Sequence, residues 1–216
     1  EFFGRYEAAQ RLSRERRVDI AGPTRWKSTV TTRKKILTYA GKKANAEIRI
    51  DYNPAWETVT VEEAKVVGAD GAAKTIRDEE MNLMDAAWAG GAPRYPAGKT
   101  LVLSLPGVDV GSIIETRITT ESRDKPFFSL VESFGGSDPV ATRTLVVTAP
   151  AGMDLATQTL PGRGHPAPSL ETRTADGRTI HTWTAANIPG FKDESARFVA
   201  DSSKARVGDI VMAIGN

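Results

Sequence analysis

The chain has 216 residues, of which 40% are hydrophobic, and it carries 29 Lys and Arg against 27 Asp and Glu. The absence of cysteine excludes disulfides, thiolate metal sites and a cysteine nucleophile. No apolar run reaches the roughly 18 residues of a transmembrane helix. We expect no secretory signal, because the chain is polar and basic after Phe3. The length fits one β-sandwich or two small domains.

The N-terminal part of the chain is strongly basic. Residues 1–43 hold twelve Lys and Arg against four Asp and Glu, whereas the remainder has an acidic excess. Residues 6–16 have a helix-compatible pattern, and residues 16–21 and 28–39 predict strands. No RNA-binding aromatic signature accompanies the basic residues, so we expect no nucleic-acid partner. Solvated strands, or strands whose charge protects a sheet edge, are the favoured interpretation.

The next two predicted strands follow one another along the chain, and the second contains an irregularity. Residues 46–52 alternate between apolar and charged side chains, and a second strand covers 57–67. In this second strand the apolar positions change parity, which predicts a β-bulge near Glu62 and Glu63. A turn with glycine at 68–71 follows.

Residues 78–99 are the least regular segment. Residues 78–89 predict a short helix, and the long connection over 81–99 carries Trp88, Arg94 and Tyr95 among Gly and Pro. Such side chains suit contact with a partner or a sugar, but aromatics that cap the end of a sandwich produce the same pattern. Tyr52 and Trp56 leave the same two interpretations open.

The rest of the chain returns to strand patterns. Residues 101–118 resemble a glycine-rich phosphate loop, but Gly111 precedes a β-branched, alternating run instead of a helix, so a nucleotide site is excluded. The remaining predicted strands cover 101–105, 112–120, 127–134, 142–149, 155–160 and 208–214, with a hairpin turn at 175–178. The sequence therefore predicts an all-β fold, an antiparallel multi-stranded β-sandwich with few short helices.

The sequence offers no recognisable catalytic or metal-binding constellation. His165 and His181 lack a partner at suitable spacing, so we expect no metal, no cofactor and no catalytic residue. The carboxylates at 62–63 and 78–80 suggest glycoside hydrolysis, but adjacent residues of a strand point to opposite faces. A solvated surface is the favoured interpretation of both acidic groups.

Four blocks of sequence, at 51–76, 91–118, 125–129 and 177–192, together resemble the N-terminal domain of unknown function found in bacterial transglutaminase-like proteins. The resemblance covers about Val18 to about Phe198. It implies an all-β sandwich, usually in exported proteins of the periplasm or cell exterior, followed by a papain-like core with a Cys-His-Asp triad. Because this chain has no cysteine, no catalytic residue of that core carries over.

On this basis we expect a single accessory sandwich over residues 1–200. Residues 201–216 form a terminal strand or the lead-in to a transglutaminase-like core. The domain would position that core, or contact a protein or glycan substrate, through Trp88, Arg94, Tyr95, Tyr52 and Trp56. One alternative is a carbohydrate-binding module that uses these loop aromatics, and another is a stand-alone hydrolase that uses carboxylates.

Overall fold

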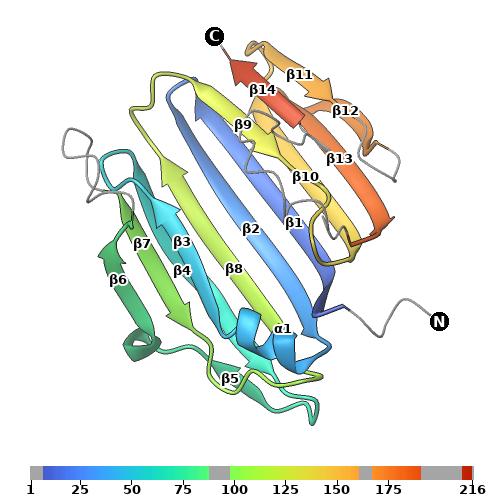
Figure 1. The fold of residues 1–216 in the computed structure, drawn as a ribbon. Coiled ribbons are helices and arrows are strands. Elements are labelled where there is room, and N and C mark those ends of the chain that lie inside the picture. The colour runs from blue at the N-terminus through green and yellow to red at the C-terminus, as the bar shows by residue number, and fades with distance from the viewer. Residues whose placement is uncertain (1–6, 88–97, 161–166, 191–210, 216) are drawn as a thin grey trace, which may run out of the picture.

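An eight-stranded β-sheet runs across the molecule, and two three-stranded sheets lie on one of its faces (Figure 1). The computed structural model describes residues 7–87, 98–160, 167–190 and 211–215. Within these residues strands dominate, with one α-helix, α1 (Tyr39–Ala44), and one 3₁₀ turn at Asp78–Glu80. The all-β sandwich predicted from the sequence is therefore confirmed.

The first two strands of the chain lie in the middle of the large sheet, and a hairpin forms each edge. The strand order is β12 (Ser169–Ala175), β13 (Arg178–Ile188), β10 (Val140–Pro150), β1 (Ala9–Gly22), β2 (Arg25–Ile36), β8 (Ile113–Ser122), β4 (Glu57–Val67) and β5 (Ala73–Thr75). All neighbours are antiparallel except β1 and β10, which are parallel. A parallel pair needs a long connection, and more than half of the chain separates these two strands.

The two small sheets cover different parts of the same face (Figure 1). One contains β3 (Glu47–Tyr52), β7 (Lys99–Ser104) and β6 (Met81–Asp85), with β7 in the middle. The other contains β11 (Leu155–Thr159), β14 (Val211–Gly215) and β9 (Phe128–Glu132), with β14 in the middle.

This arrangement divides the hydrophobic core into two clusters. The larger one lies between the β9 sheet and the large sheet, and contains Val18, Ile20, Trp26, Phe128, Leu130, Phe134, Val140, Leu145, Val147, Ala149, Trp183 and Ile188. The smaller one, toward β3, contains Ala9, Ile36, Val66, Leu105, Val108 and Ile114. Between them the inner face of the large sheet carries charged and hydroxyl side chains, including Arg11, Arg14, Thr32 and Thr116.

Several local predictions are confirmed. Each strand segment predicted from alternation overlaps an observed strand. The register of β4 against β8 shifts between Val61 and Glu63, where the change of parity predicted a bulge. The turns at 68–71 and 175–178 use Gly71 and Gly177 at positive φ, as the hairpin prediction requires.

Both predicted helices are wrong. Residues 81–85 form β6, whose Met81 and Leu83 lie opposite Leu103 and Leu101 of β7, so cross-strand pairing determines the conformation. Residues 9–16 belong to β1, which pairs with β2 and β10 on its two sides. A register shift between Arg11 and Ser13 places Arg11 and Arg14 on the same face, and this three-residue spacing imitates that of a helix.

The helix α1 was not predicted, because its residues continue a strand-like segment. The hydroxyl of Thr38 caps it by accepting a hydrogen bond of 3.1 Å from the backbone N–H of Gly41. Gly41 is buried against the backbone of Ala8, and the carbonyl oxygen of Ala8 accepts hydrogen bonds from Leu37 and Thr38. The start of β1 and the start of α1 therefore touch through backbone atoms.

Gly41→Ala is expected to lower the free energy of unfolding by about 1–3 kcal/mol, through overpacking. A Cβ at this position would lie 1.8 Å from the carbonyl oxygen of Ala8, and backbone cannot move aside as a side chain can. Gly22→Ala is the matched control, since no atom lies within 4 Å of its Cβ position. Urea denaturation of both variants tests this, and equal losses would contradict it.

Candidate functional site

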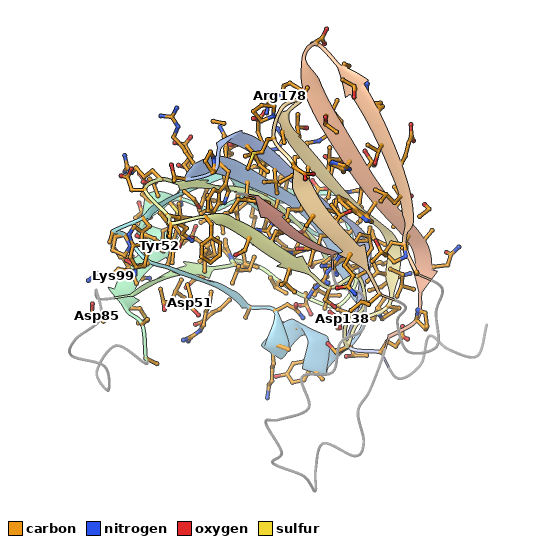
Figure 2. The ribbon with its side chains drawn as sticks, turned by 90° about the horizontal axis from the view of Figure 1, so that it is seen from above. Asp51, Tyr52, Asp85, Lys99, Asp138 and Arg178 are labelled. Atoms are coloured by element: carbon orange, nitrogen blue, oxygen red, sulfur yellow. The ribbon has the colours of Figure 1, made fainter. Side chains whose placement is uncertain are left out.

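The structure describes two of the five residues predicted from the sequence to bind. Tyr52 ends β3 and is half-buried, and Trp56 lies in the turn before β4 with 38% of its surface exposed. Across the small sheet Tyr52 lies opposite Lys99, which forms an ion pair of 2.7 Å with Asp85 (Figure 2). Trp88, Arg94 and Tyr95 lie outside the described residues, so their binding role stays a prediction.

A group of arginines surrounds one buried carboxylate on the inner face. Glu132 of β9 is 5% exposed, because it shares the inward parity of Phe128 and Leu130. Its Oε1 accepts a hydrogen bond of 2.6 Å from Arg143 of β10, and its Oε2 accepts one of 2.9 Å from Arg16 of β1. Arg14 approaches no closer than 3.6 Å. One carboxylate thus holds two arginines and attracts a third.

This arrangement shifts several pKa values. Burial alone would raise the pKa of Glu132, but the attraction of Arg143, Arg14 and Arg16 outweighs burial and lowers it below the ordinary value. Burial lowers the pKa of Arg14 to about 10, and Arg143 contributes to the lowering while Glu132 opposes it. Burial and Arg143 also lower the pKa of Arg11, whereas Asp138 and Glu132 oppose the lowering. The site is therefore rich in positive charge that is partly removed from water.

A cleft of about 430 Å³ adjoins this cluster, between β3 and the inner face of β1, β2 and β8. We call it the cationic cleft. Its charged lining residues are Arg11, Arg14, Lys34, Arg49 and Asp51, and its apolar ones are Val30, Ile48, Ile50, Ile114 and Ile118. Positive groups beside an apolar wall can hold an anion that carries a hydrophobic body.

The basic N-terminal residues consequently serve another purpose than the one expected from the sequence. The prediction that their charge protects a sheet edge is wrong, because β1 and β2 are central strands. Arg33 and Glu115 pair at 2.7 Å on the outer face, where the expected solvated charge is found. Arg11, Arg14 and Arg16 point inward, toward Glu132 and the cationic cleft.

The described histidine and the two adjacent carboxylates considered from the sequence contact neighbouring side chains of the fold. His181 stacks on Trp183 at 5.8 Å and lies 3.0 Å from the hydroxyl of Thr172, and burial lowers its pKa. Glu62 accepts a hydrogen bond from Thr119, and Glu63 pairs with Lys65. His165 is outside the described residues.

No group of three or more His, Cys, Asp or Glu in the described part of the chain could hold a metal ion. No helix among the described elements has the length and apolar character needed to cross a membrane.

Several solved structures are similar to this chain. The chain resembles the crystal structure of a "putative protease" from Parabacteroides distasonis, with a TM-score of 0.85 and 18% identity, over 97% of this chain and 40% of that one. An M1 zinc metallopeptidase from Deinococcus radiodurans aligns over 97% of this chain and 42% of its own, at 13% identity and a TM-score of 0.47. The CBM3a-L domain of a cellulosome scaffoldin from Clostridium thermocellum aligns over 55% of this chain and 69% of its own, at 10% identity and a TM-score of 0.30.

Only the first of these likenesses is close enough to support a shared fold, and its low identity limits it to the fold. None of the curated proteins matches the sequence. The model of DUF3857, a domain of unknown function with a solved structure, matches residues 23–192. This match covers most of the chain, which therefore belongs to the DUF3857 family.

Proposed function

We propose that this chain is a non-catalytic accessory domain of a longer, exported, transglutaminase-like protein, in which it positions the catalytic core or contacts its substrate or partner. The observation that carries the proposal is the share of each chain that the structural alignment covers. Nearly all of this chain aligns with only 40% of the similar protein from Parabacteroides distasonis. In this proposal residues 1–200 form the sandwich, and residues 201–216 supply the terminal strand or the lead-in to the core.

The distribution of exposed apolar side chains supports a contact on the side of the small sheets. The outer face of the large sheet carries ion pairs such as those of Glu115 with Arg33 and Lys65, which suit contact with water. Of the exposed large apolar side chains, four lie on the small sheets or beside them, namely Leu83, Met84, Phe127 and Val131. Exposed apolar groups of this kind are typical of surfaces that meet another protein.

We expect the chain alone to show no turnover in peptidase, transamidation and glycosidase assays, and to bind the separately produced remainder of its polypeptide. Val131→Asp should weaken this binding by about tenfold or more, because Val131 is 57% exposed on β9. Val110→Asp is the matched control, since Val110 is 48% exposed in the turn before β8 and lies beside Gly68 and Ala69, at the β5 edge of the large sheet. Turnover by the chain alone, or equal binding by wild type and Val131→Asp, would refute the proposal.

A further inference from the structure

Two arginines of the cationic cleft lack an acceptor among the described residues. The buried Nε of Arg11 and of Arg14 has no hydrogen-bond partner. The guanidinium of Arg11 forms no ion pair with a described residue, and that of Arg14 only approaches Glu132 at 3.6 Å. Both side chains line the same cleft, whose lining includes one carboxylate, that of Asp51.

The nearby carboxylates are already engaged. Both oxygens of Glu132 accept hydrogen bonds, from Arg143 and Arg16. Asp138 pairs with Lys34 at 3.0 Å, and Asp51 accepts a hydrogen bond of 2.5 Å from Thr100. Figure 2 shows Asp51 and Asp138 well apart from each other in the molecule. Among the described residues no side-chain carboxylate lies at hydrogen-bonding distance from Arg11 or Arg14, and Asp138 and Glu132 attract Arg11 only from farther away.

The guanidinium groups of Arg11 and Arg14 are partly removed from water without a carboxylate at hydrogen-bonding distance. A partly buried guanidinium loses hydration and recovers it only through an acceptor, and the lowered pKa values of Arg11 and Arg14 agree with that loss. A carboxylate or phosphate supplies acceptors whose geometry matches the guanidinium fork. Binding an anion would thus stabilise the cleft.

The apolar residues that line the cationic cleft indicate the character of the rest of the ligand. Ile48 and Ile50 of β3 face Ile114 and Ile118 of β8 and Val30 of β2 across the cleft, next to the arginines. Its volume, about 430 Å³, lies in the range of small-molecule sites. A bare inorganic anion would leave this apolar wall in contact with water, whereas an anion with a hydrocarbon body would cover it.

We propose that the cationic cleft binds a small amphipathic anion, with Arg11 and Arg14 holding a carboxylate or phosphate head and the isoleucines packing its aliphatic or aromatic body. This assigns a ligand-binding role to the chain that is independent of its proposed role as an accessory domain. The site needs only residues of β1, β2, β3 and β8, all of which belong to this chain.

Isothermal titration of the chain with five probes tests the proposal. Octanoate and octyl phosphate carry both parts of the ligand, acetate and inorganic phosphate carry the head alone, and 1-octanol carries the body alone. We expect one site per chain for octanoate, octyl phosphate or both, and at least about tenfold weaker binding of the other three probes. The better of the two octyl anions identifies the head group.

Arg11→Gln/Arg14→Gln should weaken binding of the octyl anions by at least about tenfold. Arg33→Gln/Arg117→Gln removes the same charge from the outer face of the large sheet and should leave binding unchanged. Because Arg11 and Arg14 lack acceptors, the first variant should melt without ligand at a temperature equal to or above that of wild type.

The proposal fails if neither octyl anion binds at about 10 mM. It also fails if octanol binds as tightly as octanoate, or if the Arg11→Gln/Arg14→Gln variant folds and retains wild-type affinity. A clear drop in the melting temperature of this variant would show instead that the two arginines stabilise the fold, and would likewise refute the proposal.

Discussion

Trp183→Ala is expected to lower the free energy of unfolding by about 3–5 kcal/mol. Trp183 of β13 has no exposed surface and is the largest of the fully buried side chains. It packs in the larger core cluster, and its Nε1 donates a hydrogen bond of 3.0 Å to the hydroxyl of Thr159 on β11. The substitution therefore leaves a cavity and also removes a link between the large sheet and the small sheet above it.

The same substitution at an exposed position gives the matched control. Trp56→Ala should change the free energy of unfolding by less than about 1 kcal/mol, because Trp56 lies in a turn outside both core clusters. Urea denaturation monitored by circular dichroism suits both variants, because each lacks one tryptophan and tryptophan fluorescence would not be comparable with wild type. Similar losses for the two would contradict the described core.

Glu132→Gln is expected to lower the free energy of unfolding by about 3–5 kcal/mol, since it removes the charge that compensates buried cations. Glu132 and Arg143 are both buried and joined at 2.6 Å, and Arg16 depends on the second oxygen. Glu121→Gln is the control, because Glu121 pairs with Lys27 at 3.8 Å on the exposed outer face. We expect the control to change stability by less than about 0.5 kcal/mol.

The dependence of stability on pH provides a second readout for Glu132. Its pKa is lowered by folding, so its contribution is complete above the unfolded pKa and is lost as the pH falls through the folded pKa. Wild type should therefore lose stability below about pH 4.5, the ordinary value for glutamate, and Glu132→Gln should lose less over that window. Parallel profiles for the two proteins would contradict the ion cluster.

The strands were predictable because alternation is a local property. The bulge in β4 followed from a change of parity within eleven residues, and the turns followed from single glycines. The helix predictions over 6–16 and 78–89 failed for a non-local reason. β1 and β6 are extended because distant strands pair with them, and the bulge in β1 gave its arginines a helix-like spacing.

The cationic cleft was not predictable in the same way, since its residues come from strands that are far apart in the chain. One signal was present in the sequence. Glu132 follows Phe128 and Leu130 on the inward parity of β9, and Arg143 precedes Leu145 and Val147 on that of β10. A charged side chain at a core position indicates a buried pair or a site. Which groups meet there depends on the packing of the two sheets.

Side-chain NMR of the arginine Nε–H groups tests the central claim, that Arg11 and Arg14 form an anion site in the cationic cleft, most directly. On titration with octanoate or octyl phosphate, the Nε–H signals of Arg11 and Arg14 should shift saturably, while those of Arg33 and Arg117 on the outer face stay constant. Shifts spread evenly over all four arginines, or no shift at Arg11 and Arg14, would contradict the claim.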